Sequence, residues 1–404
     1  MARNKNSVNA DYRRGFRIKL YPTDQQALFL DGCIDTSRYV YNWAVGKERE
    51  HYALYKDGKA ETQQLGPKEL RKLLRQHKKE ELWLNEFPNE LMRNSLKRVN
   101  DAYDMFFRHV TTAPPQFKTK KRSKKSFTTR SDRFHFNGKG IRIEGMRRGE
   151  YINIKHDFGF DKDQLFHNVV IVKDSTDTYW LTFSIDEVID KSVYFEENKV
   201  KESEAIGIDL NKKQRYVLSD GTIYMAPDTD KLDNKIRRLE RIRQKDISRS
   251  IIVEKDNPLE SEHQYSNRAK KRTRRLNKLY KRKHNIVQNQ IYEVSNAVCR
   301  MRPKAVVMEQ LDSRHFFGNE PYMNSQLHGI PFLTMRLTME YKCKQYGIPF
   351  ILAPSDYPSS KRCSNCGNIK ENFNRSQRIY YCQKCGYRDD RDINAAKNLQ
   401  QLAY

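Results

Sequence analysis

The sequence predicts an α+β protein with several domains, and three observations support this. Apolar residues alternate at 15–21 and again between about 127 and 187, which is typical of half-buried strands. Between 23 and 114 they recur every three or four residues, as in amphipathic helices. From 204 onward, short apolar strands alternate with long helical segments. A chain of 404 residues also exceeds what one small core accommodates.

The helical block begins directly after the first strand. Pro22 ends that strand, and Thr23 or Asp24 is a typical N-cap residue for the helix that follows. We expect this helix to break near Gly32. The most regular stripe of apolar residues follows Pro88, at Met92, Leu96, Val99, Tyr103, Phe106 and Phe107. If the first strand joins the sheet predicted between 127 and 187, the helical block is an insertion.

The second half combines a meander of strands with alternating helices and strands. Its predicted elements are strands at 205–210 and 215–219, a turn at 219–221 into a third strand, basic helical sequence at 228–300, a strand at 305–308, a helix at 332–346, a strand at 348–354 and a final helix from 391. This is the order of an RNase H-like sheet, although other α/β proteins share parts of it. The first strand should be central, with the strand before Glu309 beside it.

The composition is strongly basic. Lys plus Arg is 77 and Asp plus Glu is 51, so the formal net charge is +26. An excess of this size predicts a polyanionic partner, for which nucleic acid is the default. The mean hydropathy of −0.92 and the lack of an apolar run of about 18 residues exclude a membrane protein. The basic N-terminal stretch has no apolar segment typical of a signal peptide.

Basic residues concentrate at 116–130 and at 231–283. A solvated face is the usual explanation of a charge run, but like charges on one helix destabilise it unless a polyanion neutralises them. Asn89 and Arg93 lie four residues apart on the helix after Pro88. Their side-chain donors suit base edges, as those of any exposed polar pair would. The predicted nucleic-acid contacts are Asn89, Arg93, Lys118, Lys120, Lys121, Arg122, Arg238, Arg272 and Arg275.

Four of the seven cysteines form two CxxC pairs, Cys363 with Cys366 and Cys382 with Cys385, separated by fifteen residues. This spacing predicts a zinc ribbon in which four thiolates complete a closed, structural tetrahedron. Gly367 and Gly386 follow the pairs, where such a turn needs a positive φ. Two redox dithiols are the alternative. The other cysteines, which we expect to be small buried residues of a reduced protein, are Cys33, Cys299 and Cys343.

Three acidic residues lie at the edges of apolar elements. Asp209 is near the end of a strand, Glu309 follows a strand, and Asp392 starts the last helix. Each has a simple alternative explanation: exposure at a strand end for Asp209, pairing with a lysine for Glu309, and N-capping for Asp392. In an RNase H-like sheet, however, all three converge. Clustered carboxylates repel unless cations bind, so we predict two Mg²⁺ ions that hydrolyse a phosphodiester.

Several segments, in order, resemble the transposon-encoded TnpB family of RNA-guided nucleases, which is related to the small type V CRISPR effectors. The most specific are GIDLNKKQRYVLSDG, VVMEQLD, CSNCG with YYCQKCG, and RDINAAKNL. Others are FRIKLYP, SRYVYNWAV, NSLKRVNDAYDMFFR and PQFKTKKR. The resemblance implies a wedge β-barrel with an inserted helical recognition domain, then a RuvC nuclease domain with an inserted zinc ribbon. The implied segments are 1–22 and 115–203 (wedge), 23–114 (recognition), 204–360 and 388–404 (RuvC), and 361–387 (zinc ribbon).

The resemblance also implies an activity. Such a protein takes a guide RNA from the transposon end and cuts double-stranded DNA beside a short adjacent motif, with Asp209, Glu309 and Asp392 as catalytic Mg²⁺ ligands and one structural Zn²⁺. Repressors in this group lack one or more of the acids, whereas all three are present here. A guided repressor, a CRISPR-array-guided effector and an RNA-independent resolvase or transposase are the alternatives. We expect a cytoplasmic, nucleoid-associated prokaryotic protein whose oligomeric state is open, with a monomer favoured.

Overall fold

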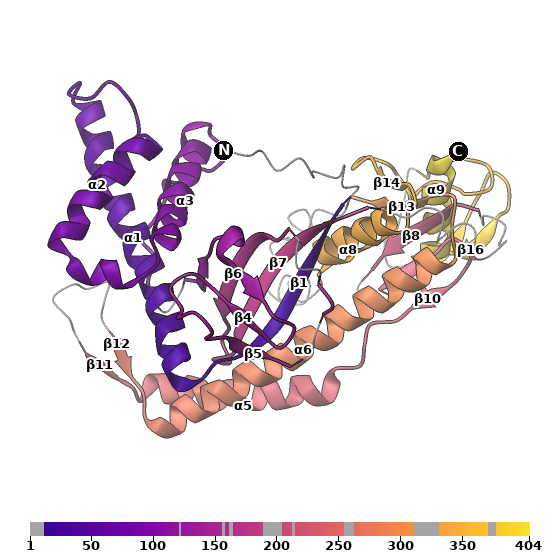
Figure 1. The fold of residues 1–404 in the computed structure, drawn as a ribbon. Coiled ribbons are helices and arrows are strands. Elements are labelled where there is room, and N and C mark those ends of the chain that lie inside the picture. Colours follow the sequence, from indigo (N-terminus) through magenta and orange to yellow (C-terminus); the bar gives the residue numbers. More distant parts are fainter. Residues whose placement is uncertain are drawn as a thin grey trace. The chain divides into compact units, whose positions relative to one another are not determined.

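The computed structural model divides into two compact units, residues 1–188 and 189–404. Its described residues are 12–120, 123–155, 158–160, 165–188, 204–211, 215–253, 262–310, 331–370 and 377–404 (Figure 1). The stretch at 195–204 is rich in Glu and Lys, which is typical of a linker, and it lies outside the described residues except for its last residue.

A seven-stranded sheet in the order β2-β6-β7-β1-β5-β4-β3 underlies the first unit. The first strand joins this sheet as predicted, because β1 pairs antiparallel with both β7 and β5. Its strands are β1 (Tyr12–Tyr21), β2 (Lys125–Thr128), β3 (His135–Phe136), β4 (Gly140–Arg142), β5 (Ile152–Ile154), β6 (His167–Lys173) and β7 (Tyr179–Glu187).

Helices fill the sequence between β1 and β2. They are α1 (Asp24–Lys56), α2 (Pro67–Glu80) and α3 (Asn89–Phe107), with a short 3₁₀ turn, η1, at Leu82–Glu86. Thr23 caps α1 in a capping box with Gln26. The predicted break near Gly32 is wrong, because α1 is continuous. A Cβ at Gly32 would lie 2.6 Å from the Phe87 ring, so this glycine permits close packing instead of a break.

The second unit contains a five-stranded sheet in the order β10-β9-β8-β13-β14. β8 is central and β13 lies beside it, both as predicted. β13 is parallel to both β8 and β14. β8, β9 and β10 form an antiparallel meander. The strands are β8 (Ile206–Leu210), β9 (Tyr216–Leu218), β10 (Ile223–Tyr224), β13 (Val306–Glu309) and β14 (Phe350–Ala353).

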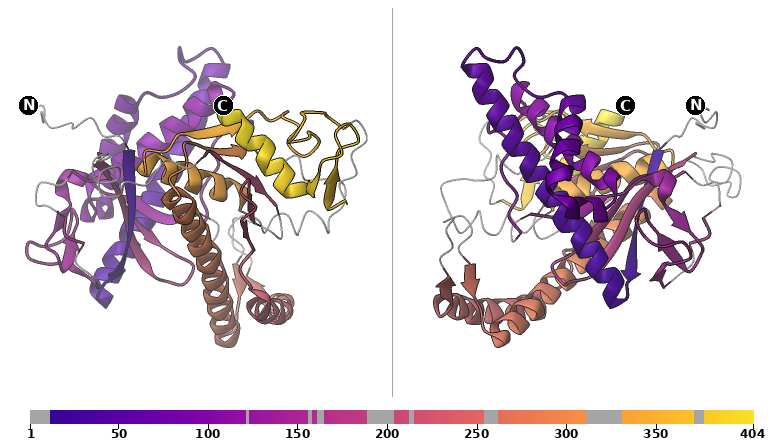
Figure 2. Two further views of the ribbon diagram at one scale, coloured as in Figure 1. Left: turned by 90° about the vertical axis from the view of Figure 1, so that its right-hand side faces the viewer. Right: turned by 60° about the vertical axis from the view of Figure 1, so that its left-hand side comes forward.

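Helices cover both faces of this sheet. α6 and α8 pack on one face through a core that includes Val298 and Met335, and α9 packs on the other through Leu399. α5 lies beside the first half of the long α6 (Figures 1 and 2). The helices are α5 (Asp230–Ser248), α6 (Asn267–Arg300), α8 (Phe332–Gln345) and α9 (Arg391–Gln400), which continues into η5 (Gln401–Ala403).

Two short antiparallel strands, β11 (Ile251–Val253) and β12 (Glu262–Gln264), separate α5 from α6. The prediction of helical sequence throughout 228–300 is therefore wrong at this point. The β-branched run at 251–253 favours a strand over a helix. None of the helices among the described residues is long and apolar enough to cross a membrane.

Candidate active site and metal centre

Asp209 lies on the central strand of the second unit. Every residue of β8 is buried, and Asp209 is only 6% exposed. Ile206, Ile208 and Leu210 belong to the core on the α6 and α8 side. Because side chains alternate along a strand, Gly207 and Asp209 face the other side of the sheet.

The register of the sheet brings Glu309 beside Asp209. Met308 is the partner of Ile208 in the parallel pair of β8 and β13. The next residues along the two strands, Asp209 and Glu309, therefore occupy the same level and the same face. Their carboxyl groups share a hydrogen bond. Two acids 100 residues apart in the chain are thus neighbours because of strand pairing.

Helix α9 crosses the face to which Asp209 points. A Cβ at position 207 would lie 2.0 Å from the Ala396 oxygen and 2.4 Å from the Gln400 nitrogen, so only glycine allows the helix to approach this closely. Asp392 is in the first turn of α9 and is 3% exposed. The third predicted acid therefore enters the same region from the helix.

Asp390, not Asp392, is the N-cap of α9. Asp390 Oδ1 accepts hydrogen bonds from the backbone nitrogens of Asp392 (2.8 Å) and Ile393 (3.3 Å). Asp390 is therefore more than a turn or solvent residue, and N-capping no longer explains Asp392. Asp389 is also engaged, since it accepts from Lys397 Nζ at 2.8 Å.

The electrostatics of the three acids reflect burial and mutual repulsion. Burial raises the pKa of Asp209 well above its ordinary value, and the carboxylates of Glu309 and Asp392 raise it further. Burial also raises the pKa of Glu309, and Asp392 adds to the effect. Since burial and the neighbouring carboxylates disfavour the charge of Asp209, and burial with Asp392 disfavours that of Glu309, the group is suited to bind positive charge.

The carboxylate of Asp392 has protein partners of its own. Arg391 Nη2 donates to Oδ1 at 2.8 Å, and Arg378 Nη1 donates to Oδ2 at 3.1 Å. Asn211, which follows β8, donates to Oδ2 at 3.0 Å. Within the described part of the chain, the three carboxylates do not all lie within 4.8 Å of one another, in contrast to the cysteines. Sequence reasoning missed Asn211 and the roles of both arginines.

The four predicted zinc-ligating cysteines lie together. Their sulfur atoms are all within 4.8 Å of one another. Sγ of Cys363 is 3.7 Å from Sγ of Cys385, and Sγ of Cys366 is 3.6 Å from Sγ of Cys382. A tetrahedral zinc with 2.3 Å Zn–S bonds requires edges of about 3.8 Å. The donor atoms therefore fit Zn²⁺, and each short distance joins one CxxC pair to the other.

Both CxxC turns have the same backbone geometry. Gly367 N donates to the Cys363 oxygen and Gly386 N donates to the Cys382 oxygen, each at 2.9 Å. The two glycines have φ values of +73° and +75°, as predicted from their positions. Strands β15 (Ile379–Tyr381) and β16 (Arg388–Asp390) pair around the second turn. The tightness of the turns follows directly from the glycines.

Two asparagines on α9 attach the first CxxC turn to the helix that contains Asp392. Asn394 Nδ2 donates to the Arg362 oxygen at 2.8 Å, and the Ser364 nitrogen donates to Asn394 Oδ1 at 3.0 Å. Asn398 Nδ2 donates to the same Arg362 oxygen at 2.6 Å. Both asparagines are fully buried. Their four-residue spacing on a helix was the signal that sequence reasoning overlooked.

The three remaining cysteines are buried in apolar cores, as predicted: Cys33 in the first unit, and Cys299 and Cys343 in the second. Cys299 and Cys343 lie 4.0 Å apart between their sulfur atoms and form no disulfide.

Two family models match parts of the chain. Residues 332–399 match the Cas12f1-like TNB domain. Residues 12–57 match the helix-turn-helix domain of the OrfB_IS605 type, although here they form strand β1 and the single helix α1.

The chain is also similar to known proteins over almost all of its length. It is 24% identical to a "Putative RNA-guided DNA endonuclease" from Streptomyces pristinaespiralis, over 96% of this chain and 88% of that protein. It is 23% identical to "Putative RNA-guided DNA endonuclease InsQ" from Escherichia coli K12, over 96% and 91%. A "TnpB-like protein L79" from Acanthamoeba polyphaga mimivirus is 33% identical over 34% of this chain and 26% of that protein. The resemblance to the TnpB family is thereby confirmed.

A solved structure shares the fold of this chain. It is a chain of the cryo-EM Cas12f1–sgRNA–target DNA complex, with a TM-score of 0.55 at 16% identity, over 94% of this chain and 83% of that one.

A basic groove of about 540 Å³ separates α2 from α3. Asn89 and Arg93 line it, together with Lys68, Arg71, Leu74, Arg75 and Lys78. Asn89 Oδ1 accepts from Lys78 Nζ at 2.7 Å, and Arg93 lies 3.5 Å from Glu90. Burial lowers the pKa of Lys78. Asn89 and Arg93, which were predicted from their spacing on the helix, therefore lie within a larger cationic surface.

The other predicted contacts have different environments. Arg238 and Arg275 are exposed on α5 and α6, whereas Arg272 forms an ion pair with Asp246 at 3.0 Å between these helices. Lys120 forms an ion pair with Asp35 at 3.0 Å. Lys121 and Arg122 lie outside the described residues.

Proposed function

We propose that this chain is a transposon-encoded, RNA-guided DNA endonuclease that cuts target DNA beside a short adjacent motif. The observation that carries the proposal is the convergence of Asp209, Glu309 and Asp392 from two parallel strands and one helix. Similarity to proteins named as RNA-guided DNA endonucleases over 96% of the chain supports it.

The domain layout proposed here follows the resemblance. A wedge would comprise 1–22 and 115–203, with the recognition domain at 23–114. Helices α1 to α3 between β1 and β2 support this insertion. A RuvC domain would comprise 204–360 and 388–404, and the order β10-β9-β8-β13-β14 supports it. Residues 361–387 would be the zinc ribbon.

Asp209, Glu309 and Asp392 would bind Mg²⁺. Buried carboxyls that repel one another fit this role, and their spread beyond 4.8 Å suits ligands shared between two ions better than a single ion. Bound Mg²⁺ activates a water and stabilises the leaving oxygen of a phosphodiester. The chain positions the acids: strand pairing sets Asp209 beside Glu309, and Arg391 with Asn211 orients Asp392.

The four cysteines would bind one structural Zn²⁺. With four protein ligands, no coordination position is left for a substrate. Asn394 and Asn398 connect this site to α9, so zinc binding would stabilise the start of the helix that contains Asp392.

The partners would be a guide RNA and double-stranded target DNA. Backbone contacts with an RNA–DNA heteroduplex need many cations and few base-specific groups, which suits Lys118, Lys120, Lys121, Arg122, Arg238, Arg272 and Arg275. Asn89 and Arg93, in the groove between α2 and α3, have donors for base edges of the adjacent motif.

The test is cleavage of a matched DNA target by the protein purified with its co-transcribed RNA, in Mg²⁺. We expect cleavage by wild type and by Asp356→Asn, which changes an exposed aspartate away from the acids. Asp209→Asn should bind the target and leave both strands intact. Cleavage by Asp209→Asn at the wild-type rate would contradict the assignment. Cleavage that survives removal of the RNA would contradict guided action.

A further inference from the structure

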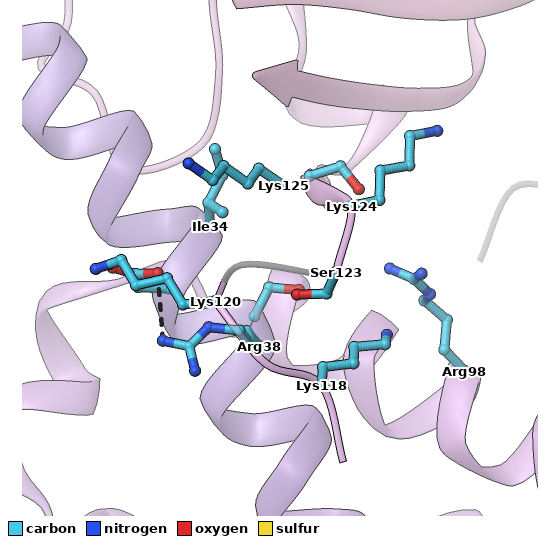
Figure 3. Close-up of a pocket in the computed structure, with 11 residues that line it drawn as sticks. Ile34, Arg38, Arg98, Lys118, Lys120, Ser123, Lys124 and Lys125 are labelled. Carbon is cyan, nitrogen blue, oxygen red and sulfur yellow. Dashed lines mark hydrogen bonds and ion pairs between the residues drawn. The ribbon is translucent and has the colours of Figure 1, made fainter. Parts of the chain in front are cut away.

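A small pocket in the first unit collects positive side chains from three segments of the chain. α1 contributes Arg38, α3 contributes Arg98, and the other positive side chains come from the segment before β2 and from the first residue of β2 (Figure 3). Asp35 is the carboxylate in its lining. The six cationic side chains that line it are Arg38, Arg98, Lys118, Lys120, Lys124 and Lys125.

Lys118 is fixed in place before any ligand binds. Its backbone nitrogen donates to Asn42 Oδ1 at 2.7 Å, and Asn42 Nδ2 donates to the Lys118 oxygen at 2.9 Å. Its ammonium lies 3.3 Å from the centre of the Tyr41 ring. Because the cost of ordering the segment is already met within the fold, a ligand of Lys118 would bind to a preorganised group.

Lys118 and Arg98 face each other without a counter-ion. The two side chains extend toward the same space from different elements (Figure 3). Burial, with Arg98 in addition, lowers the pKa of Lys118 to about 8. In the part of the chain that the structure describes, neither side chain pairs with a carboxylate. Two adjacent cations of this kind are stabilised by an anion between them.

The one carboxylate of the lining is occupied elsewhere. Asp35 lies 3.0 Å from Lys120 Nζ and 3.4 Å from Arg38 Nη2. Arg38 Nε is buried and has no hydrogen-bond partner among the described residues. A buried donor without a partner costs free energy, which a bound anion would recover.

The size of the pocket limits the anion. Its volume is about 20 Å³, close to the room that one or two water-sized oxygen atoms need, so the charged oxygens of a group held at its mouth fit, whereas a base or a nucleoside does not. We propose that this pocket binds a single backbone phosphate of nucleic acid, with Lys118 and Arg98 as its two main ligands. This inference rests on the proposed function, because it assumes that the chain binds RNA and DNA.

Salt-dependent binding of Arg98→Gln, Lys118→Gln and the double variant tests the proposal. Binding of the co-transcribed RNA to the protein, and of target DNA to the RNA–protein complex, are measured against salt concentration. Loss of one phosphate contact should reduce the slope of log K against log salt by about 0.7 for a single strand or about 0.9 for B-DNA. The arm that changes identifies the nucleic acid that supplies the phosphate.

Both single variants and the double variant should show the same reduction, because both residues contact one phosphate. The control double variant Lys139→Gln/Arg148→Gln removes two exposed charges outside the pocket, and its effects should be small and additive. Lys118→Arg, which keeps the charge, should retain most of the affinity. Wild-type slopes in both arms, or additive losses at Arg98 and Lys118, would overturn the proposal. Wild type would still cleave in that case, whereas failure of the proposed function would abolish wild-type cleavage itself.

Discussion

The cysteine cluster and the three carboxylates of the second unit are both candidate metal sites, but they are built differently. The sulfur atoms lie within 4.8 Å of one another, whereas the carboxylates, also described, are more widely spread. Thiolates that close a tetrahedron bind one ion and exclude substrate. Carboxylates on separate elements leave positions for water and phosphate oxygens. This difference is what we expect if the cysteines form a structural site and the carboxylates a catalytic one, as proposed above.

Helix α9 connects the two sites. Its first turn contains Asp392, and Asn394 and Asn398 bind the backbone of the first CxxC turn. Arg378, at the start of the β15–β16 ribbon, donates to Asp392. Changes at the cysteines should therefore reach the acids, whereas changes at the acids should leave the cysteines intact.

Asp209→Asn should have the largest effect on cleavage. The change keeps the shape of the side chain and removes a metal ligand, so we expect a loss on the order of a thousandfold. Zinc content should stay at one ion per chain, measured by atomic absorption. A variant that loses both cleavage and zinc would show that the two sites are not separable.

Cys382→Ser should remove zinc and loosen residues 361–387. A tetrahedral site that loses one thiolate binds zinc far more weakly, and the ribbon has little other core. Limited proteolysis should cut this segment in the variant, and cleavage of DNA should fall as well. Cys33→Ala changes a buried cysteine of the first unit and is the matched control. Full zinc content in Cys382→Ser would contradict the assignment.

Glu48 shows that a buried acid by itself is not a metal site. It is fully buried in α1, accepts from the Leu65 nitrogen at 2.9 Å, and its Oε1 has no hydrogen-bond partner among the described residues. Burial raises its pKa from 4.5 to about 7. The folded state therefore binds the proton more tightly than the unfolded state does, and the free energy of unfolding falls as the pH rises through this range.

The decrease in the free energy of unfolding caused by Glu48 should be up to about 3 kcal/mol. Glu48→Gln should remove it and raise the melting temperature above that of wild type near pH 8, without changing metal binding. Thermal unfolding of wild type and Glu48→Gln between about pH 5 and pH 8 measures the pH dependence of stability and the difference in melting temperature. Equal pH profiles for the variant and wild type would show that Glu48 does not titrate as its burial predicts.

Arg378→Gln should have the smallest effect. Arg378 is 60% exposed and donates to an Asp392 oxygen that Mg²⁺ would bind, so the two cations compete. The carboxylate of Asp392 is buried, but the solvated guanidinium of Arg378 limits the pair to about 0.2–1 kcal/mol, which predicts a decrease of about 1.4- to fivefold in the Mg²⁺ concentration for half-maximal cleavage. Arg388→Gln, an exposed arginine on β16, is the control. An increase in that concentration would instead indicate that Arg378 positions Asp392 for the metal.

Much of the second unit could be predicted because its signals are local. The strand before Glu309 lies beside the central strand as expected, and both CxxC glycines have the predicted positive φ. Spacing along the chain specifies these features directly.

Features that depend on tertiary contacts could not be predicted in the same way. Gly32 and Gly207 resemble helix and strand breakers in sequence, yet both permit close packing, against Phe87 and α9. Asp390 and Asp392 are both suited to cap a helix, and only the start of α9 decides between them. The pairing of Asp392 with Arg378 depends on where the β15–β16 ribbon lies.

Asp209, Glu309 and Asp392 are proposed to bind hydrolytic cations. The most direct measurement replaces Mg²⁺ by Fe²⁺ in the RNA–DNA complex, generates hydroxyl radicals, and maps the resulting backbone cuts by mass spectrometry. We predict cuts next to all three acids, suppressed by excess Mg²⁺ and absent in Asp209→Asn. Cuts confined to other parts of the chain, or unchanged in Asp209→Asn, would contradict the claim.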